Sequence, residues 1–152
     1  MAKNLIDITF SNSTNNKTWK DGFFDDVIGG AISFLKLKGQ LSVGVHLVGE
    51  ARIKSLNKEH REKNKVTDVL SFPIGQECDN CGIIDLGDIF ISLPVAIKDS
   101  EKSRVKTKSH LATLSIHGFL HLLGYDHEKS IKDSEKMFDL QKKILNSINL
   151  GD

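Results

Sequence analysis

The chain has 152 residues, of which 39% are hydrophobic and 27% are charged, and its formal net charge is +1. This size and composition predict one globular domain over residues 1–152 with a substantial core. The near-neutral charge excludes a general electrostatic attraction to nucleic acid, so any such affinity has to come from a local patch. No apolar run is long enough to cross a bilayer, and the first residues lack the apolar stretch of a signal peptide. A cytoplasmic protein without membrane partners is therefore expected.

Apolar periodicity predicts alternating strands and helices in the first half of the chain. Strands are expected at 5–10 and 41–48, and helices at about 18–38, ended by Gly39, and at about 50–63. Gly29 and Gly30 lie inside the first helix and weaken it by roughly 1 kcal/mol each, so we expect a close packing contact there. His46, on the polar side of the second strand, is expected to be a structural histidine with its ring nitrogens satisfied.

The second half adds two strands and ends in helices. Strands are predicted at 67–74, closed by Pro73, and at 82–93, with a bulge at Gly87; helices follow at about 94–104, 107–123 and 130–148. In the last helix, Ile131, Met137 and Leu140 are expected on the core side. The predicted fold class is α+β, a mixed sheet of about four strands packed by about five helices.

The segment from His117 to His127 has the spacing His-x3-His-x5-His. His117 and His121 are one helical turn apart and point the same way. Gly124 is expected to end the helix in a left-handed conformation, and the turn brings His127 back towards the pair. Three neutral imidazoles around a tetrahedral ion leave one position for water, the arrangement of a catalytic zinc site. The spacing thus predicts a zincin-like metal site.

The same spacing is typical of metzincin proteases, in which the residue after the first histidine is a glutamate general base. That position is Gly118 here, so the general base stays unassigned. Asp126 adjoins a predicted ligand and is expected to accept an imidazole N–H or to fix the loop. His110 lies roughly 10 Å before His117 along the helix axis. It is too far to be a fourth ligand and is expected to be structural.

Other polar residues give weaker indications. Asp68 and Asp88 end or cross strands and are expected to be structural, although the bulge before Asp88 can re-aim its side chain towards a site. Cys78 and Cys81 form a single Cys-x2-Cys pair in a turn-like segment, without a second pair to complete a zinc site. We expect them to be incidental loop thiols.

The segment from Arg52 to Lys65 holds six basic residues against two acidic ones. One interpretation is an ordinary solvated helix face. The other is a surface that binds phosphate groups, because arginine can grip an anionic oxygen pair with two parallel hydrogen bonds.

Four motifs together resemble the signature of the YbeY family of bacterial rRNA maturation factors. They are His-Gly-x-Leu-His-Leu-x-Gly-Tyr-Asp-His at 117–127, Thr-Asp-Val-Leu-Ser-Phe-Pro at 67–73, Leu-Gly-Asp-Ile at 86–89 and Leu-Asn-x3-Arg at 56–61. They occur in the family's order, and the resemblance covers most of the chain. His60, Asn64 and Val66 depart from the residues usual in the family and lie beside Arg61.

The resemblance implies a zinc-dependent endoribonuclease, specific for single strands, that acts in 16S rRNA 3′-end maturation and ribosome quality control. It implies one Zn²⁺ per chain on His117, His121 and His127, and a functional, catalytic arginine at Arg61. Its implied partners are single-stranded RNA and the ribosome or ribosomal proteins, and no DNA is expected. Two alternatives stay open: a metallohydrolase of peptides or amides, and a non-catalytic ribosome-associated factor whose zinc is structural.

Overall fold

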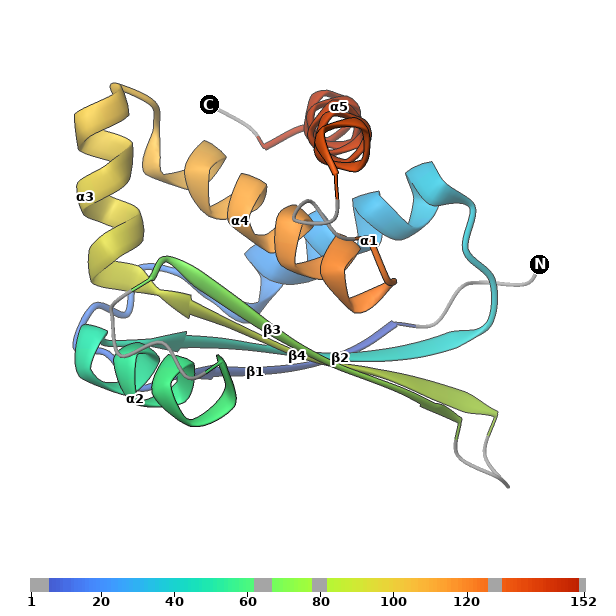
Figure 1. Ribbon diagram of the computed structural model, residues 1–152, viewed down its shortest axis with the longest axis horizontal. Coiled ribbons are helices and arrows are strands. Elements are labelled where there is room, and N and C mark those ends of the chain that lie inside the picture. Colours follow the sequence, from blue (N-terminus) through green and yellow to red (C-terminus); the bar gives the residue numbers. More distant parts are fainter. Residues whose placement is uncertain (1–5, 62–66, 78–81, 126–129, 151–152) are drawn as a thin grey trace.

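The computed structural model describes residues 6–61, 67–77, 82–125 and 130–150. These residues form β1 (Ile6–Asn12), α1 (Asp21–Leu35), β2 (Gln40–Val48), α2 (Glu50–Arg61), β3 (Val69–Glu77), β4 (Ile83–Ser92), α3 (Leu93–Ser103), α4 (Thr107–Leu122) and α5 (Ile131–Ser147). The predicted α+β class, with a four-stranded mixed sheet and five helices, is confirmed (Figure 1). Within these ranges, every helix is too short or too polar to cross a membrane.

The sheet has the strand order β1-β2-β4-β3, with β1, β2 and β4 parallel and β3 antiparallel to β4 at the edge. The register of β4 against β2 shifts by one residue just before Gly87. Gly87 has a φ of 119°, and a Cβ there would collide with the carbonyl oxygen of Phe72. Only glycine fits this position, and the predicted bulge is confirmed.

Pro73 does not close the third strand, so that part of the prediction is wrong. β3 continues to Glu77, with an irregularity in its pairing between Pro73 and Gln76. An edge strand tolerates proline because only one of its two sides is hydrogen-bonded to a neighbour.

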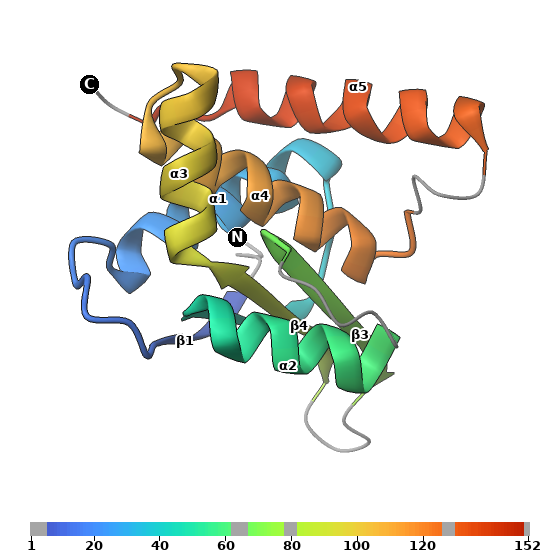
Figure 2. The same ribbon diagram turned by 60° about the vertical axis from the view of Figure 1, so that its left-hand side comes forward.

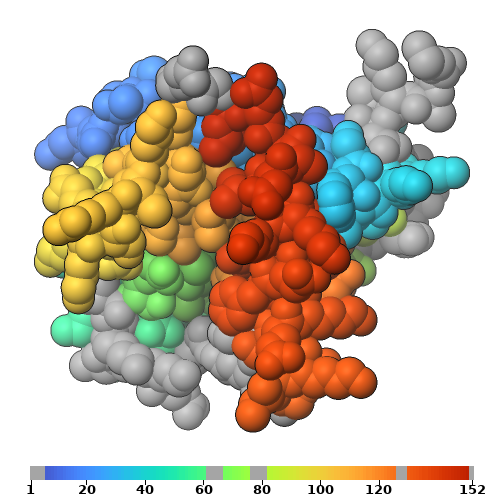
Figure 3. All heavy atoms as spheres, turned by 90° about the horizontal axis from the view of Figure 1, so that it is seen from above, coloured from blue at the N-terminus to red at the C-terminus, as the bar shows by residue number. Residues whose placement is uncertain are grey.

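Helices cover both faces of the sheet (Figures 1 and 2). The larger core lies between one face and helices α1 and α4, and it includes Val43, Val45, Leu47, Ile89 and Ile91 from the strands. On the other face, α2 packs on β3 and β4 through a smaller cluster of Val48, Ile53, Leu56 and Leu70. Seen from the side of the larger core, α5 runs beside α4, and a patch of β3 reaches the surface between α3 and α5 (Figure 3).

α4 is the central helix, in contact with the sheet and with α1, α3 and α5, and nine of its 16 residues are buried. It approaches the sheet most closely at Gly118, where a Cβ would lie 2.7 Å from Cγ2 of Ile89. The hydroxyl of Ser71 donates a hydrogen bond to the Gly118 carbonyl at 3.1 Å. Successive residues of an α-helix are rotated by about 100° about the helix axis. Because Gly118 faces the sheet, His117 and His121 both point to the same side of this contact.

Two helix predictions need correction. α1 ends at Leu35, because Lys36 adopts the left-handed conformation with a φ of 57°, and Gly39 lies in the following loop instead of stopping the helix. Ile131 is 80% exposed, because it is the first residue of α5 and precedes the part that packs, whose buried residues are Met137 and Ile144. The close contact expected inside α1 is found at Gly30, where a Cβ would lie 2.6 Å from Cγ1 of Ile148.

Candidate metal centre

His117 and His121 come from successive turns of α4, and their rings meet. Their Nε2 atoms are 3.1 Å apart, and the ring planes are inclined at 77°. Two imidazole nitrogens on one tetrahedral zinc, each about 2.05 Å from the ion, are roughly 3.3 Å apart. The observed spacing therefore suits two ligands of one ion. The same two atoms can also share a proton as an N–H···N hydrogen bond when no ion is between them.

α5 orients the ring of His117 from its other side. Nδ1 of His117 lies 2.8 Å from Oε1 of Gln141. An amide oxygen can only accept, so with this amide orientation Nδ1 carries the proton and donates it. Nε2 of His117 then keeps its lone pair for a metal ion. Metal-binding histidines are usually held by such a second hydrogen bond, which sets the tautomer and the ring direction.

Phe138, one helical turn before Gln141, stacks on the same histidine. The ring centroids of Phe138 and His117 are 5.9 Å apart and the planes are inclined at 26°. Phe138 remains 47% exposed. The candidate metal ligand is thus flanked by an aromatic face that solvent can reach.

Gly124 closes α4 in a left-handed conformation, as predicted. Gly124 has a φ of 101°, its N–H bonds to the His121 carbonyl at 3.0 Å, and the N–H of Tyr125 bonds to the Leu120 carbonyl at 3.1 Å. This pattern is a common way to close a helix. The third predicted ligand, His127, and the neighbouring Asp126 lie outside the described residues, as do Cys78 and Cys81.

Position 118, which carries the general base in metzincin proteases, faces the sheet in this protein. Gly118 packs against Ile89, which is fully buried, and it leaves no room even for a Cβ. A longer side chain at this position could not reach a substrate beside His117. The absence of glutamate here therefore follows from how α4 packs on the sheet.

The basic segment does not join the histidine pair within the described part of the chain. Arg52, Lys54 and Lys58 are exposed on α2, and α2 packs on the face of the sheet opposite to α4 (Figure 1). Neighbouring residues of β3 point to opposite faces of the sheet: Ser71 contacts α4 on one face, and Leu70 packs with α2 on the other. Arg61 is the last residue of α2, and its side chain lies outside the described part of the structure.

His46 is satisfied away from the histidine pair, as predicted. Its Nδ1 lies 2.7 Å from the Ser11 hydroxyl, its Nε2 lies 2.9 Å from Oδ1 of Asp88, and its ring stacks on Phe90 at 4.6 Å. Gly44 leaves the space that the Asp88 carboxylate fills. The bulge at Gly87 therefore does re-aim Asp88, but towards His46.

Two residues of the site, Gln141 and Phe138, are not among those predicted from the sequence. The apolar spacing of the last helix predicts only which of its residues face the core. Gln141 is four residues after Met137 and three before Ile144, the two buried residues of α5. A polar residue on the apolar stripe of an amphipathic helix was the signal that could have indicated a buried partner.

Fold and site together define a class, an α+β protein whose central helix carries two imidazoles suited to one metal ion. The family model described as Endoribonuclease YbeY matches residues 7–149. The Endoribonuclease YbeY of Mesoplasma florum is 38% identical over 152 residues, covering 95% of this chain and 89% of that protein. The Endoribonuclease YbeY of Persephonella marina is 43% identical over 108 residues, covering 71% of each chain. This chain belongs to the YbeY family and thereby to a family of endoribonucleases.

The fold is also similar to a solved structure. The solution structure of TM1509 from Thermotoga maritima aligns with a TM-score of 0.62 at 28% sequence identity, covering 92% of this chain and 87% of that one. The arrangement of strands and helices around α4 therefore recurs over almost the whole chain.

Proposed function

We propose that this protein is a zinc-dependent endoribonuclease that cleaves single-stranded RNA, with one Zn²⁺ per chain held by His117, His121 and His127. The observation that carries the proposal is the 3.1 Å approach of the Nε2 atoms of His117 and His121, with His117 oriented by Gln141. Membership of a family described as Endoribonuclease YbeY supports RNA as the substrate.

The family resemblance extends the proposal to biology. The substrate proposed is 16S rRNA, cleaved in maturation of its 3′ end and in ribosome quality control, in the cytoplasm. The ribosome or ribosomal proteins are the proposed partners. A local phosphate-binding surface is needed for this role, because the formal net charge of the whole chain is only +1.

The side chains of this protein have separate tasks in the proposed reaction. Bound zinc would supply an activated water near neutral pH and a Lewis acid for a phosphoryl oxygen. Gln141 holds His117 in the tautomer that leaves Nε2 free. Phe138 offers a stacking face beside His117 for an unpaired base, which favours single strands over duplexes. Arg61 is proposed to neutralise charge on the non-bridging phosphate oxygens.

The alternative of a peptide or amide hydrolase has less support. The histidine spacing is shared with metzincin proteases, but Gly118 packs on Ile89 in place of their general base. The other alternative, a ribosome-associated factor with structural zinc, makes a different prediction about folding. A structural ion carries folding free energy, so its loss unfolds the protein.

Metal analysis and cleavage assays on the purified protein test the proposal. We expect one zinc per chain. A single-stranded RNA oligonucleotide should be cut, and the duplex of the same sequence and casein should not. A chelator should stop the cleavage and added zinc should restore it. Casein cleavage without RNA cleavage would favour the hydrolase alternative and contradict the proposal.

Variants separate catalysis from folding. His117→Ala and Arg61→Ala should each lower RNA cleavage by at least about 10²-fold, with an unchanged circular dichroism spectrum. Lys38→Ala, which removes an exposed basic side chain in the loop after α1 and outside the basic segment, is the control and should retain activity. An unfolded His117→Ala protein would show that the zinc is structural.

A further inference from the structure

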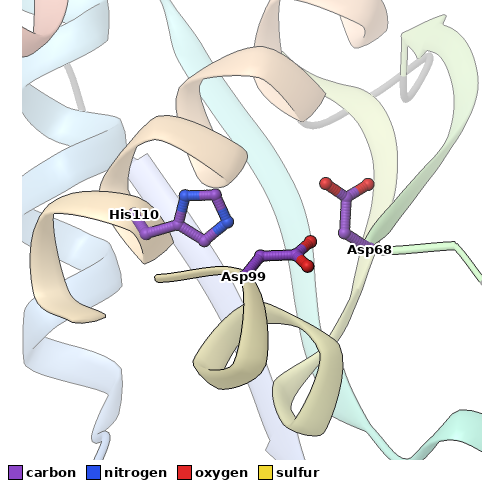
Figure 4. Close-up of side chains that lie close together, drawn as sticks. All are labelled: Asp68, Asp99 and His110. Carbon is purple, nitrogen blue, oxygen red and sulfur yellow. The ribbon is translucent and has the colours of Figure 1, made fainter. Parts of the chain in front are cut away.

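Three potential metal ligands meet on the same side of the sheet as α4, outside the histidine pair. Asp68 immediately precedes β3, Asp99 lies in α3 and His110 lies in the first turn of α4. One carboxylate oxygen from each aspartate and one ring nitrogen of His110 all lie within 4.8 Å of one another. Figure 4 shows the two carboxylates and the imidazole gathered around a common space. All three residues are half-buried.

Within this group, the ring of His110 lacks, in the described part of the chain, a hydrogen bond that its burial calls for. Its Nε2 atom is buried and has no hydrogen-bond partner among the described residues. A buried imidazole nitrogen without a partner is unfavourable, because it loses its hydrogen bond to water and gains none. The sequence alone predicts only a structural histidine at this position, and the structure places two carboxylates beside it.

The backbone around the three side chains is already braced. The Asp68 carbonyl accepts a hydrogen bond from the N–H of Ser92 at 2.8 Å. Ser100, next to Asp99, meets the hydroxyl of Thr107 at 3.1 Å across the junction of α3 and α4. Other contacts therefore fix the relative positions of the elements that carry the three ligands. This lowers the entropy lost when the ligands are ordered around an ion.

We propose that Asp68, Asp99 and His110 form a second cation site, separate from the histidine pair, which takes a divalent first-row transition ion. Two carboxylates and one imidazole make a mixed oxygen and nitrogen donor set, which suits Mn²⁺ or Zn²⁺ better than Ca²⁺ or Mg²⁺. Three ligands spaced evenly around one ion with bonds of about 2.2 Å are about 3.6–3.8 Å apart. Shifts of roughly 0.6–0.7 Å in each ligand atom bring the three atoms, which lie within 4.8 Å of one another, to that spacing.

The position of this site decides what it does. His110 is seven residues before His117, which is roughly 10 Å along the helix axis and close to the same side of α4. Paired catalytic metals are about 3.5–4 Å apart. An ion at this second site is therefore too far away to act on the same phosphate as one at His117. Its role is to tie the beginning of β3 to α3 and α4.

Mn²⁺ titration followed by electron paramagnetic resonance tests the site, because the signal of free Mn²⁺ falls as the ion binds. The wild-type protein and the His117→Ala/His121→Ala variant should both bind one Mn²⁺ at this site, and Mn²⁺ should raise the melting temperature of both. Asp99→Asn and His110→Gln should each weaken that binding by at least about tenfold. Asp7→Asn, which changes an exposed aspartate on β1, is the matched control and should bind normally.

The outcomes are decisive in either direction, and none of them depends on RNA cleavage. Binding that persists in Asp99→Asn and in His110→Gln but disappears in His117→Ala/His121→Ala would place the ion at the histidine pair and overturn the proposal. Absence of Mn²⁺ and Zn²⁺ binding by the His117→Ala/His121→Ala variant, with its fold intact by circular dichroism, would also overturn it. If that variant does not fold, the comparison of Asp99→Asn and His110→Gln with wild type decides alone.

Discussion

Removing the acceptor that orients His117 should weaken zinc binding without removing a ligand. The change is Gln141→Met, which keeps an unbranched side chain of similar length in α5 but cannot accept the hydrogen bond from Nδ1 of His117, now 2.8 Å long. The ring of His117 then loses one of the contacts that set its tautomer and direction. Phe138 still stacks on the ring, so we expect a weakened site and not a disordered one.

The expected loss of zinc affinity is the difference between the free-energy cost of the substitution with the ion bound and its cost without the ion. An unpaired N–H of His117 costs about 1–3 kcal/mol, but much of that cost is present with and without the ion and cancels. What remains is the stronger hydrogen bond of an imidazole polarised by the metal. Losses of such outer contacts weaken metal binding about 10- to 100-fold, or roughly 1.4–2.7 kcal/mol. Gln141→Glu offers a charged acceptor and should bind zinc at least as tightly as wild type.

Competition with a chromophoric chelator measures the zinc affinity of each variant. The matched control is Gln40→Met, the same substitution at an exposed position at the start of β2, and it should bind zinc like wild type. Equal affinities of Gln141→Met and wild type would refute the reasoning. So would an equal loss in Gln141→Met and Gln141→Glu, because an acceptor would then not be what matters.

Three other predictions test packing, substrate binding and electrostatics. Gly118→Ala adds a methyl group 2.7 Å from Ile89. Overpacking costs about 1–3 kcal/mol and the higher helix propensity of alanine returns about 1 kcal/mol, so the free energy of unfolding, measured in urea, should fall by up to about 2 kcal/mol. A more stable variant would contradict the packing. Phe138→Ala should raise the KM for single-stranded RNA about tenfold while Phe34→Ala, another exposed phenylalanine, leaves it unchanged; equal effects would exclude stacking at Phe138. Partial burial and then two neighbouring aspartates raise the pKa of Asp25, so its contribution to stability falls as pH rises through the unfolded and then the folded pKa. Asp25→Asn should therefore add up to about 0.5 kcal/mol at pH 7 and nothing at about pH 3, measured by urea unfolding at both values; a stabilisation that is equal at both pH values would exclude this electrostatic origin.

Where the sequence predicted correctly, the signal was local to the backbone. The bulge at Gly87 and the helix stop at Gly124 both need a positive φ, which glycine adopts without strain, so the residue type itself carries the information. Strand and helix positions followed from apolar spacing, because that spacing records which side of an element is buried.

Where the sequence misled, a non-local contact or the position in the fold decided the outcome. Pro73 signals the end of a strand, but an edge position in the sheet tolerates it and β3 continues. Ile131 has the apolar character of a core residue, but it comes before the packed part of α5 and stays exposed. Lys36 ended α1 although glycine was available three residues later.

The sequence by itself determined the elements, the α+β class and the pairing of His117 with His121 one turn apart, because each depends on spacing within a single segment. Only the tertiary structure decided which residues from other segments meet that pair. The packing of α5 on α4 brings Gln141 to His117, and the junction of β3, α3 and α4 brings Asp68 and Asp99 to His110. Such contacts join residues 11 to 42 positions apart. They depend on how helices rotate and cross when the core closes, which no local pattern encodes.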